Sequence, residues 1–245
     1  MLVLTLCYRI IGFVREMLVA SYLGTSAEAD AYSIAYSVPT VVVEMLALGA
    51  IGSASIAVFQ SVLQKDGKQR LNQLYSRVMA AILLALAALL LLCELGAPLL
   101  TKLMAPSFSG EKMALTVSMV RSMLPAILFV GVLGLQKAAL NLMGDFRSEG
   151  ISNVVFNCAM VAGVLFAARQ DRIDILIHSF IAAAFLQWLV QFRSIRRVGL
   201  RPSPDLHLRD EDLHRIFVLL IPIMFSTVVS QISPVAARAV ASTCE

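Results

Sequence analysis

The chain has 245 residues, of which 59% are hydrophobic and 15% are charged, and its formal net charge is +4 at pH 7. Water-soluble domains carry about 25% charged residues, so this composition excludes a water-soluble core. The positive charge does not indicate a nucleic-acid partner, because in a membrane protein the placement of Lys and Arg in the connections matters more than their sum.

Long apolar segments follow one another along the chain, and each could cross the roughly 30 Å hydrocarbon core of a bilayer. Backbone amides in lipid must find partners within their own segment, and long continuous runs do so as helices. The sequence therefore predicts an all-α integral membrane protein with about seven transmembrane helices. We place them at Leu2–Leu23, Asp30–Leu63, Tyr75–Leu100, Ala114–Leu142, Ile151–Ala168, Ile173–Phe192 and Leu213–Ala241.

Basic residues are distributed unevenly between alternate connections. Eleven Lys and Arg follow the second, fourth and sixth predicted helices, and four follow the first, third and fifth. By the positive-inside rule the eleven face the cytoplasm, and so does the N-terminus. The first segment carries three charged residues, so we do not expect it to be a cleaved signal peptide.

The longest connection, 193–212, contains Pro202 and Pro204 and ends in the charged run Arg209–Asp212. Such a stretch favours a linker between two bundles. We predict a six-helix transmembrane unit over 1–197, a cytoplasmic linker over 198–212, and the first helix of a further unit over 213–245.

Several charged residues lie where lipid should exclude them. A charge near the bilayer centre costs at least about 2.5–3.5 kcal/mol, so such residues normally face a bundle interior or an aqueous cavity. Arg9 and Glu16 are two helical turns apart and share a face, about 10 Å apart along the axis, whereas Arg15 is expected to point elsewhere. The candidates for a transport path on this basis are Arg9, Arg15, Glu16, Glu44 and Arg121, with Lys137 nearer a helix end.

Each of these residues also has a plainer interpretation. Arg9 could snorkel to the cytoplasmic interface, and Arg121 and Lys137 could be interfacial anchors. Glu44 could pair with an arginine of the first helix or could serve a substrate or a proton. These alternatives stay open at the level of sequence.

Helix-breaking residues mark candidate hinges at Gly12, Pro39, Pro125 and Pro222. Such residues serve close packing or kinks, and in transporters they also open cavities. Four widely spaced cysteines and three lone histidines predict neither a metal site nor a disulfide framework. With no P-loop, paired carboxylates or nucleophile motif, we expect no cofactor and no enzyme.

The order of motifs in the first sixty residues resembles the signature of the MurJ/MviN lipid II flippases, whose superfamily includes the MATE exporters. The likeness rests on Arg9-Ile10-Ile11-Gly12-Phe13-Val14-Arg15-Glu16, Leu23-Gly24, Ala29-Asp30-Ala31-Tyr32 and Val38-Pro39. It continues at 105–108, at 121–125, at Asn157 and at 222–242.

This resemblance implies a two-lobe transporter in the bacterial inner membrane, of which residues 1–197 form a MATE-like N-terminal lobe. It also implies that Arg9, Arg15 and Asp30 match residues in or near the family's transport path. The cargo would be an undecaprenyl-pyrophosphate glycan, whose anionic head suits arginine donors. An ion gradient or the membrane potential would drive alternating access, with the coupling ion unspecified.

The chain departs from the family pattern in the second helix and in length. Ser37, Val43-Glu44 and Leu48-Gly49 stand where members usually have a basic residue, an arginine pair and a glutamate-glycine pair. We therefore keep three hypotheses: a lipid II-like or other polyprenyl-glycan flippase, a cation-coupled drug exporter using Glu44, and a non-transporting remnant. The length predicts a partial chain, which would be a fragment, a truncated gene product, or half of a split transporter completed by another chain.

Overall fold

The computed structural model describes residues 2–45, 48–203 and 210–220, and every regular element within these ranges is a helix. The elements are α1 (Leu2–Leu23), α2 (Ala27–Met45), α3 (Leu48–Leu95), α4 (Ala97–Met104), α5 (Gly110–Met123), a 3₁₀ turn η1 (Leu124–Ala126), α6 (Ile127–Val130), α7 (Leu133–Leu142), α8 (Arg147–Gln170) and α9 (Ile173–Arg197). A further helix covers 211–220. The prediction of an all-α membrane protein is confirmed.

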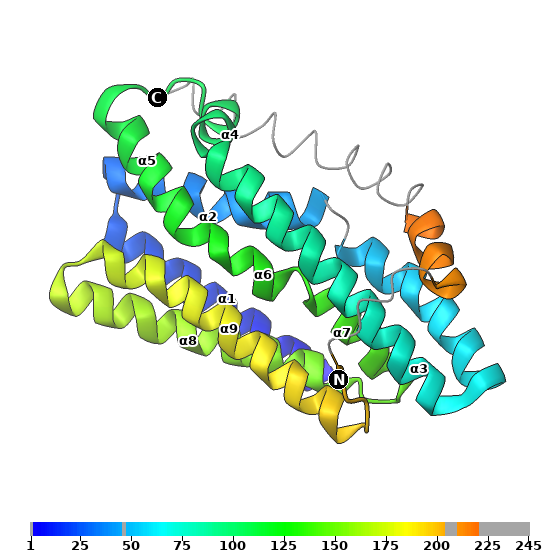
Figure 1. The fold of residues 1–245 in the computed structure, drawn as a ribbon. Coiled ribbons are helices and arrows are strands. Elements are labelled where there is room, and N and C mark those ends of the chain that lie inside the picture. The colour runs from blue at the N-terminus through cyan, green and yellow to red at the C-terminus, as the bar shows by residue number, and fades with distance from the viewer. Residues whose placement is uncertain (1, 46–47, 204–209, 221–245) are drawn as a thin grey trace.

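The helices form a layered bundle in which α1, α8 and α9 lie side by side (Figure 1). On the other side α2 packs on α5, and α3 packs on α7. Four of the described segments are long and apolar enough to cross a membrane by length and composition, namely 51–95, 110–142, 147–170 and 173–197. Helix α1 is not among them, and it carries the three charged residues Arg9, Arg15 and Glu16.

Helix boundaries follow local signals that the sequence carries. Gly24 has φ of +59°, and its N–H donates to the Ala20 carbonyl at 2.9 Å, which closes α1. Ser26 then accepts a hydrogen bond from the Ala29 N–H at 3.1 Å and caps α2. Asp145 caps α8 in the same way, accepting from the N–H groups of Arg147 and Ser148.

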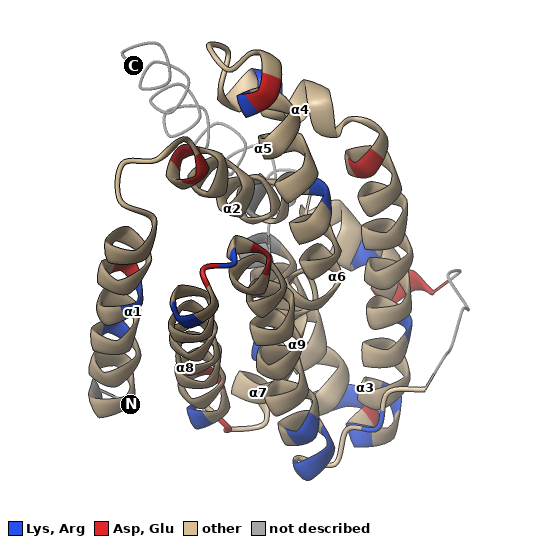
Figure 2. Cartoon of the chain, turned by 90° about the vertical axis from the view of Figure 1, so that its left-hand side faces the viewer, with Lys and Arg blue, Asp and Glu red and all other residues tan. Residues whose placement is uncertain are grey.

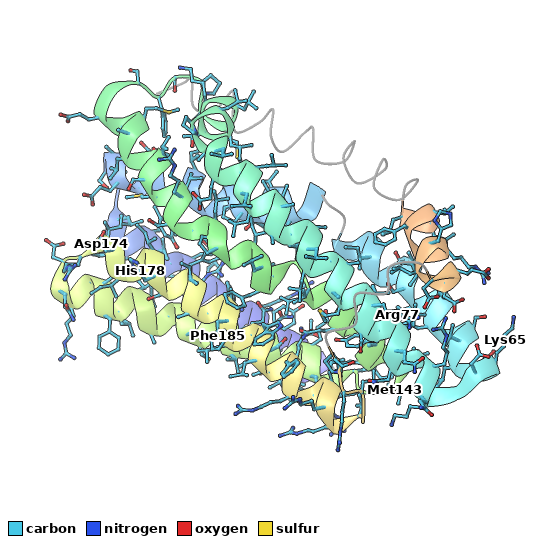
Figure 3. The ribbon with its side chains drawn as sticks, in the orientation of Figure 1. Lys65, Arg77, Met143, Asp174, His178 and Phe185 are labelled. Carbon is cyan, nitrogen blue, oxygen red and sulfur yellow. The ribbon has the colours of Figure 1, made fainter. Side chains whose placement is uncertain are left out.

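Two predicted helices have different bounds in the structure. The segment predicted to begin at Tyr75 begins directly after Gly67, where φ is +77° and ψ is −175°, so α3 is two helices joined at one residue. It ends at Leu95, because Gly96 separates it from α4. Figure 3 shows Lys65 near the tip of the bend.

The predicted helix Ala114–Leu142 is also interrupted, because η1 and α6 separate α5 from α7. Pro125 lies in η1, where its ring excludes the regular α-helical hydrogen bond. In contrast, Pro39 lies inside α2, which continues to Met45. Gly12 lies inside an uninterrupted α1. Pro222 is outside the described residues.

The remaining predictions agree in part with the structure. Helix α1 has the predicted bounds, and α8 and α9 extend the predicted segments by a few residues. The predicted second helix is helical on both sides of 46–47, which are not described. The division into units at 198–212 stays a prediction, although a helix already begins at 211.

Candidate functional site

Arg15 of α1 lies at the junction with α2, and its side chain is only 13% exposed. Its Nη1 donates a hydrogen bond to Tyr36 Oη at 3.2 Å. Its Nη2 donates to the carboxylate of Glu16, which is 63% exposed. We call Arg15, Glu16, Tyr32, Tyr36 and Phe156 the α1–α2 junction.

Aromatic rings surround the Arg15 guanidinium. Its Cζ lies 5.6 Å from the centroid of the Tyr36 ring and 5.9 Å from that of Phe156. Phe180 of α9 contacts both rings, with centroids 5.1 Å from Tyr36 and 6.2 Å from Phe156. Such cation–π contacts contribute about 0.5–2 kcal/mol each and hold a cation without neutralising it.

A pocket of about 210 Å³ opens between α1 and α2, and its lining includes Glu16 and Tyr36, the two hydrogen-bond partners of Arg15. Glu16, Tyr32, Ser33, Tyr36 and Ser37 contribute its polar lining. A guanidinium at low exposure and a carboxylate in an apolar helical bundle have the features of a candidate functional site.

Helix α1 rests on α8 through small residues. A Cβ placed on Gly12 would stand 3.4 Å from Asn157 Oδ1, so the two helices approach closely there. Asn157 Nδ2 donates to the Asn153 carbonyl at 2.9 Å and lies 3.5 Å from the carbonyl oxygen of Tyr8 in α1. This contact fixes the position of α1, and with it the position of Arg15.

Asp30 of α2 forms its ion pair with α5 and not with a residue of the α1–α2 junction. Its carboxylate forms an ion pair with Lys112 of α5 at 2.6 Å, and Lys112 also lies 4.1 Å from the Phe108 ring centroid. The pair ties the first turn of α2 to α5.

The other sequence candidates are not brought together at this site. Arg9 on α1 and Arg121 on α5 are exposed, and neither has an ion pair or side-chain hydrogen bond within the described ranges. Lys137 pairs with Glu149 at 2.6 Å. The side chain of Glu44 lies outside the described residues.

As expected, Arg15 lies toward another side of α1 than the exposed Arg9 and Glu16, although its long side chain also reaches the neighbouring Glu16 carboxylate. Sequence reasoning missed the aromatic partners. Tyr32 and Tyr36 are one helical turn apart, with ring centroids 6.1 Å apart, and this spacing was the available signal. Phe156 gives no local signal of its own.

A second polar site fixes the segment that follows α9. Asn72 Nδ2 donates to the carbonyl of Arg201 at 3.1 Å, and the Arg201 N–H donates to Asn72 Oδ1 at 2.6 Å. The Ser203 N–H donates to Ser76 Oγ at 3.1 Å. We call residues 198–203 together with Asp210 the strap, since they lie against α3.

Asp210 is the buried end of the strap, with a side chain 2% exposed. Arg70 binds it at 2.9 Å and Asp212 at 3.0 Å, and Arg77 also forms an ion pair with Asp210. Burial would raise the pKa of the Asp210 carboxyl, but hydrogen bonds from both arginines and from the Asp212 N–H hold that pKa below its ordinary value.

Lys and Arg gather at the end of the bundle where α9 ends and α3 bends, the end at which α1 begins (Figure 2). The described residues contain no group of three or more His, Cys, Asp or Glu side chains that could hold a metal ion.

A family model described as "Lipid II flippase MurJ" matches residues 19–245. The chain is 27% identical over 237 residues to the lipid II flippase MurJ of Burkholderia cenocepacia, covering 94% of this chain and 46% of that protein. It is 27% identical over 241 residues to the probable lipid II flippase MurJ of Haemophilus influenzae, covering 94% and 47%.

A solved structure, "Lipid II flippase MurJ, inward closed conformation", matches with a TM-score of 0.81 and 23% identity. The match covers 98% of this chain and 50% of that one, so it supports the fold. The chain spans about half the length of the curated relatives it matches.

Proposed function

Because the chain belongs to the lipid II flippase MurJ family, we propose that it forms the first half of a transporter for a polyprenyl-pyrophosphate-linked peptidoglycan precursor. The head group would cross the bacterial inner membrane by alternating access while the polyprenyl tail stays in lipid. The second half would come from a further lobe, on this chain or another. The proposal concerns transport, with no covalent chemistry.

The observation that carries the proposal is Arg15, a cation held at low exposure whose partners Glu16 and Tyr36 line a pocket between α1 and α2. A guanidinium has five N–H donors. Its hydrogen bonds to Tyr36 and Glu16 use two of them within the described part of the chain. The remaining donors suit the oxygens of a pyrophosphate, which arginine binds through charge-assisted hydrogen bonds.

We assign Arg9 and Asp30 different parts in this path. Arg9 is exposed on α1 without an ion pair in the described ranges, so it is the cation available for first contact with an anionic head. Asp30 is paired with Lys112, so we propose that it fixes α2 against α5 beside the path. Direct roles for Glu44 and Arg121 remain predictions.

Orientation is part of the same proposal. The basic end of the bundle, where α9 ends, would face the cytoplasm by the positive-inside rule, together with the start of α1. The energy source would be an ion gradient or the membrane potential.

The test is complementation in bacteria depleted of their own lipid II flippase, with the chain expressed as part of a complete two-lobe transporter. We expect rescue by the parent, and loss of rescue with precursor accumulation for the double variant Arg9→Ala/Arg15→Ala. The double variant Arg169→Ala/Arg172→Ala is the matched control, because both arginines are exposed where α8 ends and α9 begins, outside the proposed path.

Membrane fractionation must show that each variant inserts to the same level. Full rescue by Arg9→Ala/Arg15→Ala would overturn the proposal. Loss of activity on Glu44→Gln, with both arginines dispensable, would instead favour a cation-coupled exporter on the same fold.

A further inference from the structure

An open groove of about 510 Å³ lies between α3, α6 and α9, away from the α1–α2 junction. Most of its lining is apolar and comes from three helices, with Met79 and Leu83 from α3, Phe129 from α6, and Trp188 and Phe192 from α9. The proposed transport path does not use it.

One wall of the groove is a cluster of aromatic rings. The Trp188 ring centroid lies 5.1 Å from that of Phe192, 5.8 Å from that of Phe185 and 6.0 Å from that of Phe129. Phe185, labelled in Figure 3, is 41% exposed. Tryptophan is enriched at membrane–water interfaces, where its apolar ring meets lipid and its N–H meets water.

The end of the groove toward the strap is basic. Pro202 and Ser203 close that end, and the adjoining hollow of about 330 Å³ is lined by Arg196 and Arg201. The Arg196 guanidinium lies 4.9 Å from the Phe192 ring centroid, which links the hollow to the groove. Within the described ranges neither arginine has a carboxylate partner.

The groove and the helix over 211–220 lie on different faces of α3. Met79 and Leu83 of α3 line the groove, whereas Ala85 and Leu89 line a hollow shared with Phe217. At 100° per residue the centres of these two pairs lie about 120° apart around the helix, so they belong to different faces. Within the described residues, the helix over 211–220 therefore does not cover the groove.

We propose that this groove is a binding site for an anionic glycerophospholipid. One acyl chain lies along Trp188 and Phe192, and the phosphate lies against Arg196 and Arg201. An apolar groove with two arginines at its mouth, neither of which has a carboxylate partner among the described residues, selects the occupant by charge, as basic pockets between transmembrane helices do. The site is independent of the proposed glycan transport.

The chain supplies its own reporter, because Trp188 is the single tryptophan in the sequence. Bromine on an acyl chain quenches tryptophan fluorescence only at close contact. We would reconstitute the full chain in vesicles and compare brominated phosphatidylglycerol with brominated phosphatidylcholine at equal mole fraction. We expect a roughly tenfold higher relative binding constant for the anionic lipid at low salt, from two arginines near the surface.

The double variant Arg196→Gln/Arg201→Gln should reduce that preference to about onefold. The matched control is Arg169→Gln/Arg172→Gln, which removes the same charge at the other end of α8 and α9 and should keep the preference. Circular dichroism and unquenched emission maxima check that the variants fold alike.

Three outcomes would overturn the proposal. Equal quenching by the two lipids would make the groove an ordinary lipid contact. An unchanged preference for the anionic lipid in Arg196→Gln/Arg201→Gln would show that these arginines do not bind the lipid phosphate. Displacement of the brominated lipid by a polyprenyl diphosphate at far lower concentration than by phosphatidylglycerol would make the occupant a transport substrate. None of these measurements depends on transport.

Discussion

The α1–α2 junction and the strap both hold arginines at low exposure, 13% for Arg15 and 19% for Arg77, yet they compensate the charge differently. At the strap, Arg77 and Arg70 share the buried carboxylate of Asp210. At the junction, Arg15 is held by aromatic faces, a hydroxyl and the exposed carboxylate of Glu16, whose attraction water screens.

This difference distinguishes a structural ion-pair contact, at the strap, from a site that could bind an anion, at the junction. At the strap the two carboxylates of Asp210 and Asp212 balance the two arginines, so little positive charge is left for a ligand. Aromatic rings instead position a guanidinium and leave its charge largely in place. On this basis the strap determines where the chain goes after α9, and the junction is the better candidate for contact with an anion.

The largest expected effect is at the strap. Asp210→Asn leaves Arg70 and Arg77 without their shared carboxylate, and because both arginines are partly exposed we expect a loss of about 2 kcal/mol rather than the full cost of a broken buried pair. For a chain of this size that lowers the thermal midpoint by about 4–8 °C. Thermal melting of the purified chain followed by circular dichroism measures it.

Glu211→Gln is the matched control, because Glu211 is the exposed neighbour of Asp210. Equal thermal midpoints for Asp210→Asn and Glu211→Gln would show that the ion pairs of Asp210 do not stabilise the fold.

The next largest effect is expected in the pH dependence of the stability that Asp210 provides at the strap. The pKa of Asp210 is lowered in the folded chain, so the unfolded state takes up the proton first as the pH falls. The stabilisation is complete above the unfolded value, about 3.9, and is lost as the pH falls through the folded pKa. The difference in midpoint between parent and Asp210→Asn should therefore shrink below about pH 4. A constant difference from pH 3 to pH 7 would contradict this assignment.

A smaller effect is expected at the α1–α2 junction. Tyr36→Phe keeps the ring beneath Arg15 and removes the hydroxyl that accepts its hydrogen bond, which should cost about 1 kcal/mol. Tyr36→Leu removes the ring as well and should cost more. We expect both to weaken transport by the complete protein in the same order, measured as precursor accumulation.

Tyr22→Phe serves as its control, since Tyr22 lies on α1 outside the aromatic cluster. Equal transport by Tyr36→Leu and Tyr22→Phe would show that the function of Arg15 does not depend on the aromatic ring of Tyr36.

The smallest effect is expected where α1 rests on α8. A Cβ at Gly12 would meet Asn157 Oδ1 at ordinary contact distance, 3.4 Å. Gly12→Ala should therefore leave the stability unchanged or raise it by up to about 0.5 kcal/mol, as helix propensity favours alanine. Gly163→Ala should be destabilising, because its Cβ would overlap the Ser179 side chain. The same melting experiment compares them, and a large loss for Gly12→Ala would mean that α1 is packed more tightly than this geometry implies.

Hydropathy alone predicted the helical membrane fold and the positions of α1, α8 and α9, because each is a long apolar run ended by turn residues. It did not predict the breaks within 110–142. There the pattern stays apolar, and the change to η1 depends on one proline and on packing against α3.

The candidate site was predicted only in part. The charge of Arg15 within a predicted span is visible in the sequence, but its partners are 21 and 141 positions away, at Tyr36 and Phe156. The pairing of Arg70 with Asp210 spans 140 positions. Contacts at such separations arise from tertiary packing, which hydrophobic periodicity does not encode. The Arg9–Glu16 motif also precedes residue 19, where the match to the family model begins.

At Gly67, where α3 changes direction, the left-handed backbone conformation restricts which residue fits, and the space around the residue does not. A Cβ there would have nothing within 4 Å, so a side chain has room. The backbone angles, φ +77° and ψ −175°, nevertheless belong to a region that is essentially restricted to glycine. Their mirror image lies in the polyproline II region, which L-residues adopt readily. In a chemically synthesised chain, D-alanine would therefore fit at this bend while L-alanine would strain it.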